Sequence, residues 1–248
     1  MFIKINNLRK EMIIIEINKI YNEDCIEGMN KLYKKNGECV DCLITDPPYN
    51  LSQKNNFKTM GRAGIDFGEW DKEFNLTSWI EPSLSILKKG GNIIIFNDWK
   101  NMSYIKDELE KNKCLIKELI IWHKTNPMPR NRDRLYVTSC EYAIWATKGK
   151  GWIYNRQRNT YENAIFEYPV VHSKKRIHPT QKPVELISDL IKIHSNEKDI
   201  ILDPFIGSGT TAMSALKNNR NYIGFELDNT YYEKAQNRID IYLNDKNK

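Results

Sequence analysis

The apolar residues of this chain gather in short runs in which isoleucine, leucine and valine dominate. The runs occupy residues 13–20, 40–45, 92–96, 116–122, 141–146, 199–203 and 221–226. Most of them are continuous rather than alternating with polar residues, which is typical of strands covered on both faces of a sheet. The pattern therefore predicts a mostly parallel, seven-stranded sheet.

Amphipathic stretches with helical spacing lie between many of these runs. They span residues 24–35, 76–87, 183–194 and 231–243. Asp24 is suited to cap the first helix, and Gly90 and Gly91 are expected to stop the second. Thr230 and Glu233 form a capping box that is expected to open the last helix. Strands that alternate with helices predict a doubly wound α/β fold.

One connection between predicted strands lacks a helical pattern. Only the segment TNPMPRNRDRLYV, with little apolar periodicity, separates residues 116–122 from residues 141–146. These two strands are therefore expected to be antiparallel neighbours joined by a loop. Residues 148–176 are irregular as well. We expect a single domain over residues 1–248 with a small irregular insertion.

Composition narrows the class of protein. Hydrophobic residues make up 40% of the chain and charged residues 28%, as in globular proteins, and no apolar run approaches the ~18 residues of a membrane span. Five scattered cysteines and the lack of a secretory signal pattern predict a cytoplasmic protein. The four histidines show no metal-ligand spacing, so no metal site is expected. The net charge of +6 alone is weak evidence for nucleic-acid binding.

A glycine-rich motif, DPFIGSGTTA, follows a predicted strand at residues 203–212 and opens a helical stretch. Gly207 and Gly209 allow a tight turn and a close approach of the backbone to a ligand. Glu226 ends the next predicted strand, where an acid can accept hydrogen bonds from ribose hydroxyls. The motif predicts a nucleoside-containing cofactor, and its G-x-G-x-x-A spacing leaves a nicotinamide-dependent oxidoreductase open.

A second motif, DPPY at residues 46–49, also stands at the end of a predicted strand. Pro47 and Pro48 offer carbonyl oxygens and no N–H group, and Asp46 adds another acceptor. Tyr49 provides a flat face for stacking. The turn therefore suits an amino group on a flat ring. Because ligands bind at the carboxyl ends of strands in open α/β sheets, both motifs are expected to border one crevice.

In this order the two motifs resemble the DNA amino-methyltransferases that act on adenine N6 or cytosine N4. The DPPY motif precedes DPFIGSGT, and HPTQKPVELI (residues 178–187) lies just upstream of the latter, as in the permuted β group of the family. Further likeness lies in YNEDCIEGM (21–29), EWDKEFN (69–75) and WHKTNPMP (122–129). The resemblance implies the methyltransferase version of the Rossmann-like fold and S-adenosylmethionine as cofactor.

The resemblance also implies roles for individual residues. The implied catalytic residues are Asp46, Pro47, Pro48 and Tyr49, which would hold the N6 amine of an adenine flipped out of DNA. The implied cofactor-binding residues are Asp24, Cys25, Asp46, His178, Thr180, Asp203, Phe205, Gly207, Ser208, Gly209, Thr210 and Glu226. No metal is implied. Asp rather than Ser at position 46 favours adenine, while the same chemistry on cytosine N4 is the alternative.

Basic loops are expected to contact DNA. Residues 124–177 are predicted to carry target recognition, because they combine basic side chains with interleaved aromatics. The candidate DNA-binding residues are Lys124, Arg130, Arg132, Arg134, Arg156 and Arg158. Many β-group relatives pair up, so a homodimer is an expectation here. A cognate restriction endonuclease is one alternative for the biological setting, and a solitary enzyme is the other.

Overall fold

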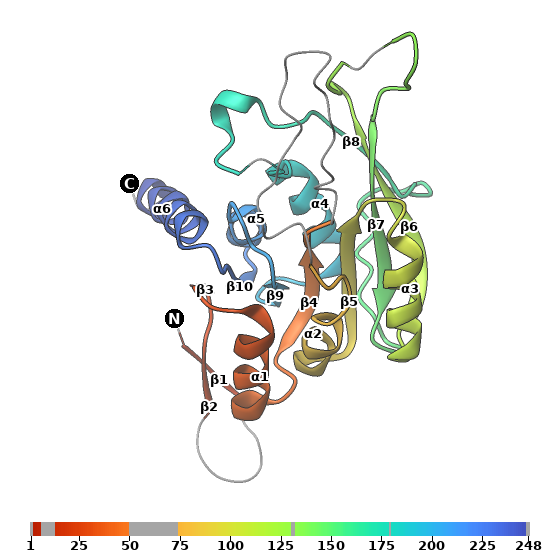
Figure 1. Ribbon diagram of the computed structural model, residues 1–248. Coiled ribbons are helices and arrows are strands. Elements are labelled where there is room, and N and C mark those ends of the chain that lie inside the picture. Colours follow the sequence, from red (N-terminus) through yellow and green to blue (C-terminus); the bar gives the residue numbers. More distant parts are fainter. Residues whose placement is uncertain (1, 6–12, 50–73, 130–131, 179, 247–248) are drawn as a thin grey trace.

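The computed structural model describes residues 2–5, 13–49, 74–129, 132–178 and 180–246, and Figure 1 shows their arrangement. The strands of the central sheet are β3 (Lys19–Tyr21), β4 (Val40–Thr45), β5 (Leu87–Asn97), β6 (Leu115–Lys124), β7 (Cys140–Thr147), β8 (Ile165–Tyr168), β9 (Ile200–Asp203) and β10 (Asn221–Phe225). Within the described residues these eight strands pair in the order β3-β10-β9-β4-β5-β7-β6-β8. A separate antiparallel hairpin consists of β1 (Phe2–Ile5) and β2 (Ile13–Glu16).

The sheet is mostly parallel, as predicted. Strands β3, β10, β9, β4 and β5 run the same way. Strand β7 is antiparallel to both of its neighbours, β5 and β6, and β8 is parallel to β6. The predicted pairing of β6 with β7 is confirmed, with Trp122 opposite Glu141 and His123 opposite Cys140. Lys124 and Cys140 therefore stand at the same edge of the sheet as the carboxyl ends of the parallel strands.

Two details of the sheet differ from the prediction. Strand β8 is an eighth member inside a stretch expected to be irregular, and its four residues, IFEY, are too few to give a recognisable apolar run. The predicted strand 13–20 is split into β2 and β3. Asn18 lies between them with a left-handed φ of 57°, and its Nδ2 donates to Oδ1 of Asn221 at 3.1 Å. The backbone turns at Asn18, so only β3 enters the main sheet.

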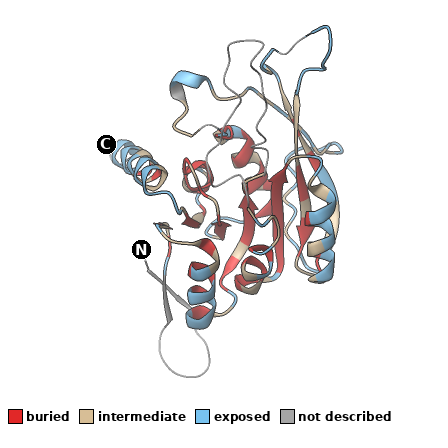
Figure 2. Cartoon of the chain, viewed as in Figure 1, coloured by how far each residue is buried: buried red, intermediate tan, exposed pale blue. Residues whose placement is uncertain are grey.

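Helices cover both faces of the sheet. The helices are α1 (Cys25–Asn36), α2 (Ile80–Ile86), α3 (Met102–Lys111), α4 (Val184–His194), α5 (Thr210–Lys217) and α6 (Asn229–Lys246). Alternate strand residues pack in opposite directions, with Ile93 in the core beneath α1, α2 and α3 and Ile94 in the core beneath α4, α5 and α6. The central strands are accordingly buried along their length (Figure 2). This explains the continuous apolar runs in the sequence.

The helix ends follow the predicted caps in part. Asp24 caps α1 by accepting a 3.0 Å hydrogen bond from the backbone N–H of Glu27. The predicted capping box of α6 is wrong, because Asp228 takes the capping position and accepts from the N–H of Tyr231 at 3.0 Å. Gly90 and Gly91 do not stop α2, which already ends at Ile86. They lie inside β5, where a Cβ on Gly90 would come within 2.9 Å of a neighbouring backbone oxygen.

Candidate active site

The two predicted motifs meet because β4 and β9 are adjacent parallel strands. Thr45 ends β4 and Asp203 ends β9, and the Thr45 hydroxyl donates to Oδ1 of Asp203 at 2.7 Å. The Asp203 carboxylate also accepts from the Phe205 N–H at 3.1 Å and from the Thr211 hydroxyl at 2.6 Å. Burial raises the pKa of Asp203 to about 6, although these hydrogen bonds favour the charged form.

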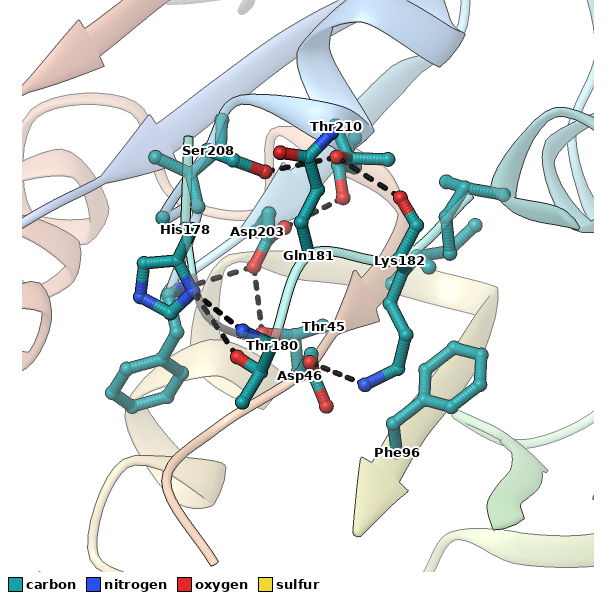
Figure 3. A pocket seen from close by; sticks show the side chains of 16 residues that line it. Thr45, Asp46, Phe96, His178, Thr180, Gln181, Lys182, Asp203, Ser208 and Thr210 are labelled. Atoms are coloured by element: carbon teal, nitrogen blue, oxygen red, sulfur yellow. Dashed lines mark hydrogen bonds and ion pairs between the residues drawn. The ribbon is translucent and has the colours of Figure 1, made fainter. Parts of the chain in front are cut away.

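A hollow of ≈ 430 Å³, counted with its space open to solvent, lies at these strand ends. Its lining includes eight of the predicted site residues, namely Asp46, His178, Thr180, Asp203, Phe205, Gly207, Ser208 and Thr210. These residues come from three separate parts of the chain, and Figure 3 shows how the side chains labelled there gather around the hollow. The expectation that both motifs border one crevice is therefore met by the geometry. That these residues bind a cofactor stays a prediction.

The glycine loop is held open by left-handed backbone and by one carboxylate. Gly207 has a φ of 49° and Gly209 a φ of 73°, a region that other residues adopt only with strain. Glu226 accepts from the Gly207 N–H at 3.0 Å through one oxygen and from the Asp228 N–H at 2.9 Å through the other. Glu226 therefore lies beside the loop rather than in the lining of the hollow.

Three other predicted cofactor residues have defined surroundings. Asp24 caps α1, and the adjoining Cys25 is buried, which raises the pKa of its thiol to about 12. Neither lines the hollow. His178 does, and burial lowers the pKa of its imidazole to about 4, so the ring is neutral at pH 7. Its Nδ1 lies 3.1 Å from the Thr180 hydroxyl, which joins these two candidates.

In the DPPY turn, the Asp46 carboxylate has partners that were not predicted from the sequence. Asp46 is hydrogen bonded to the Tyr49 hydroxyl through Oδ1, and Nζ of Lys182 lies 2.5 Å from its Oδ2. The Tyr49 carbonyl in turn accepts from Nδ2 of Asn101 at 2.9 Å. Burial raises the pKa of Asp46, and the lysine only partly offsets this effect. The chain that follows, residues 50–73, lies outside the described residues together with most of the EWDKEFN segment.

The comparison with known proteins decides the family. A family model described as DNA methylase, N6_N4_Mtase, matches residues 40–237 of the chain. The chain belongs to this DNA methylase family. The match spans both motifs and all of the central strands from β4 to β10.

Individual relatives of the methylase agree with this assignment. Type II methyltransferase M2.MboI of Moraxella bovis is 33% identical over 88% of this chain and 86% of its own length. Type II methyltransferase M.HinfI of Haemophilus influenzae is 30% identical over 94% of this chain and 71% of its own length. The solved structure of an M1.HpyAVI–SAM complex is 36% identical, with a TM-score of 0.73 over 89% of this chain and 98% of that one.

The cytosine-N4-specific PvuII DNA methyltransferase shares the fold, with a TM-score of 0.69 over 88% of this chain and 84% of that one, at 16% identity. The nicotinamide-dependent oxidoreductase alternative receives no support from these matches. The β-group assignment, which rests on motif order, stays a prediction. No helix in the described part of the chain is long and apolar enough to cross a membrane.

Two charged residues beside Asp46 were not predicted from the sequence. Lys182 is only 6% exposed, and its Nζ lies 2.9 Å from Oε2 of Glu141 as well as beside Asp46. Only Glu141 left a signal in the sequence, since it is the one charged residue in the strand Cys140–Thr147. A charged residue is seldom buried without a partner, so its place in an otherwise uncharged strand could have revealed it. Lys182 stands among polar residues and prolines in HPTQKP, which gives no sign that it is buried.

The predicted DNA-binding residues fall into different environments. Arg132 and Arg134 are exposed on the loop between β6 and β7, which projects from the carboxyl edge of the sheet (Figure 1). Arg156 and Arg158 are exposed as well, while Arg130 lies outside the described residues. Lys124 is different, because its side chain is 13% exposed and forms a 2.8 Å ion pair with Glu141.

Proposed function

We propose that this methylase transfers a methyl group from S-adenosylmethionine to the N6 amine of adenine in DNA. The observation that carries the proposal is that Asp46 and the glycine loop line the same hollow. Asp46 can therefore accept from the target amine while the glycine loop holds the cofactor in the same hollow. Family membership supports DNA as the substrate, and the SAM complex of the 36% identical M1.HpyAVI supports the cofactor.

The residues of the hollow fit S-adenosylmethionine. A Cβ on Gly207 would stand 3.8 Å from the His178 ring, so the glycine keeps space beside that ring. Asp46 and Asp203 supply carboxylates that favour a cation. When bound, the cofactor supplies a sulfonium-activated methyl group.

The DPPY turn would act on the target amine by positioning it. Carboxylate and carbonyl oxygens at Asp46 and Pro47 can each accept one amine hydrogen and so direct the nitrogen lone pair at the methyl group. A carboxylate has about four acceptor sites, so Asp46 keeps capacity beyond its bonds to Tyr49 and Lys182. Rate enhancement then comes from orientation and from stabilising positive charge on nitrogen, with no covalent enzyme intermediate.

DNA must present its base outside the helix. Flipping a base costs a few kcal/mol, and stacking on the Tyr49 ring is worth ~1–3 kcal/mol by analogy with single-strand binders. We infer that the recognition segment 124–177 adds phosphate and base contacts through its exposed arginines. A homodimer stays a further prediction, and so does a cognate restriction endonuclease, with a solitary enzyme as the alternative.

The test is a transfer assay with methyl-labelled S-adenosylmethionine and DNA, followed by digestion to nucleosides. Label in N6-methyl-2′-deoxyadenosine is the expected result. Label only in N4-methyl-2′-deoxycytidine would move the target to cytosine. The Asp46→Ala variant serves as the control, since it should lose transfer while still binding the cofactor. If Asp46→Ala turned over normally, the proposed role of the turn would be wrong.

A further inference from the structure

Lys182 lies between two carboxylates and against aromatic rings at the centre of the site. Its Nζ is 2.5 Å from Oδ2 of Asp46 and 2.9 Å from Oε2 of Glu141. The same atom stands 5.2 Å from the ring centre of Phe96 and 6.0 Å from that of Trp122. Figure 3 shows the side chain reaching from the segment before α4 to Asp46, with Phe96 alongside. The ammonium is thus fixed from several directions.

The ion pairs continue beyond Lys182. Oε1 of Glu141 accepts the ammonium of Lys124 at 2.8 Å, so charges alternate in a line from Asp46 through Lys182 and Glu141 to Lys124. The four residues come from the end of β4, the segment before α4, the start of β7 and the end of β6. The line therefore connects the reacting turn with both ends of the β6–β7 loop.

Stability alone does not account for this arrangement. Desolvating a buried ion pair costs about as much free energy as the attraction between its charges returns. Replacing such a pair by well-packed apolar side chains therefore often leaves stability equal or higher. Phe96 and Trp122 would suit an apolar side chain at position 182. A lysine held at 6% exposure therefore points to a task that needs its charge.

We propose that Lys182 is a positioning residue for methyl transfer, which orients the carboxylate of Asp46 and keeps it ionised, while Glu141 holds the ammonium in place. The proposal rests on the proposed function, since Asp46 is the acceptor of the target amine. With its Oδ2 held by Lys182 and its Oδ1 by the Tyr49 hydroxyl, the carboxylate of Asp46 has one orientation. An acceptor that is already oriented loses no freedom when the amine arrives.

Electrostatics agree with this role. Burial disfavours the ammonium, yet the carboxylates of Asp46 and Glu141 raise the pKa of Lys182, so it stays charged. The attraction of Lys182 favours the ionised form of Asp46, whereas the charge of Glu141 opposes it. The charged and titratable groups around Asp46 are Lys182, Glu141, Tyr49 and Asp203, with Lys124, His178 and Asp98 acting through these neighbours.

The experiment compares Lys182→Gln, which removes the charge, with Lys182→Arg, which keeps it. We expect Lys182→Gln to lower kcat by about 100-fold, as for a misplaced reacting group, and to move the acid limb of the kcat–pH profile upward by about 1–3 pH units. Lys182→Arg should keep the acid limb at its wild-type pH. Glu141→Gln should not move it upward, because Glu141 itself favours protonation of Asp46.

A matched control is Lys148→Gln. Lys148 has a side chain 27% exposed and pairs with Glu38 at 2.8 Å, and it stands just beyond the far end of β7. It should lose stability without a change in the acid limb. If Lys182→Gln kept its acid limb and lost activity only through unfolding, as Lys148→Gln would, the positioning role would be overturned.

A readout independent of the reaction separates this proposal from the proposed function. Carbon-13 NMR titration of the Asp46 carboxyl, assigned with Asp46→Asn, measures its ionisation directly. A pKa of Asp46 that is higher in Lys182→Gln than in the wild type, and unchanged in Lys182→Arg, supports the electrostatic role, even if the wild type methylated a different base. An unchanged pKa of Asp46 in Lys182→Gln would overturn it. Failure of the wild-type protein to methylate any DNA would instead overturn the proposed function.

Discussion

The Thr45 hydroxyl donates a 2.7 Å hydrogen bond to Asp203 and thereby ties the end of β4 to the end of β9. These strand ends carry the DPPY turn and the glycine loop. The bond is buried, because Thr45 is 2% and Asp203 4% exposed. It therefore fixes the spacing between the residues expected to hold the amine and those expected to hold the cofactor.

Removing the Thr45–Asp203 hydrogen bond should weaken cofactor binding as well as lower stability, whereas its matched control should lower stability alone. Thr45→Val leaves one bond of a buried carboxylate unmade, which typically costs about 1–3 kcal/mol of unfolding free energy. We expect weaker S-adenosylmethionine binding by isothermal titration calorimetry in addition to this loss. The matched control is Thr147→Val, another buried threonine whose hydroxyl donates to a carbonyl, that of Gly149, at 2.9 Å. It should lose stability without losing cofactor affinity.

Asp203 should also leave a signature in the pH dependence of stability. Its folded pKa of about 6 lies above the ~3.9 of an unfolded aspartate, so its contribution to stability is full below pH ~4 and is lost as the pH rises through about 6. The loss amounts to about 2–3 kcal/mol between those limits. Asp203→Asn lacks this titration.

Urea unfolding at several pH values measures the effect. Relative to the wild type, the unfolding free energy of Asp203→Asn should rise between pH 4 and pH 7, whatever its absolute value. A constant difference between the two proteins across that range would show that the Asp203 carboxyl titrates at its ordinary pKa. The cofactor is left out of these measurements, since its binding adds a separate pH dependence.

Much of the fold was predictable because its signals are local and repeated. The runs at 40–45 and 199–203 are buried on both faces, so their apolar residues are continuous and their strand assignment holds. The β6–β7 pairing followed from the missing helical pattern. By contrast, β8 is an edge strand of four residues with alternate exposure. Its parallel pairing with β6, rather than its own composition, makes it a strand.

The parts of the site that could be predicted are those whose residues end a strand. The prolines of DPPY and the glycines of DPFIGSGT mark strand ends, and the sheet brings those ends together. Lys182, Glu141 and Asn101 could not be assigned in this way. Their roles depend on contacts with Asp46 or with the Tyr49 carbonyl, and these form only after distant segments pack.

Asn101 offers a test of how firmly the DPPY turn must be held. Its Nδ2 donates to the Tyr49 carbonyl at 2.9 Å and to Oδ1 of Asn97 at 2.8 Å. Asn101→Ala should lower kcat by about tenfold, since it loosens the reacting turn, and should cost about 1 kcal/mol of unfolding free energy for the lost bonds.

Asn112→Ala is the matched control for this variant. Asn101 is the N-cap of α3 and Asn112 is its C-cap. The Nδ2 of Asn112 donates to the Glu108 carbonyl at 2.9 Å. A similar loss of stability with unchanged kcat is expected, measured by urea unfolding and by steady-state transfer. Equal loss of kcat in both variants would mean that α3 stability, rather than the hold on Tyr49, limits turnover.

Two basic residues of the recognition segment, Arg132 and Lys124, differ in their environment. Arg132 has a side chain 93% exposed on the β6–β7 loop, whereas Lys124 is 13% exposed and paired with Glu141. An exposed arginine that contacts a phosphate releases counterions on binding. Arg132→Ala should therefore reduce the slope of log K against log salt by about 1 for specific and non-specific DNA alike.

Lys124→Met should act differently. It removes one end of the line of charges that reaches Lys182, so kcat should fall while the salt slope stays near the wild-type value. Lys35→Ala, an exposed lysine in the last turn of α1, should change neither quantity, because α1 runs back from the end of β3 to the opposite edge of the sheet. DNA binding measured by fluorescence anisotropy over a range of salt concentrations checks the slopes. If Lys124→Met lowered the slope as Arg132→Ala is expected to, Lys124 would be a phosphate contact and its pairing with Glu141 would give way when DNA binds.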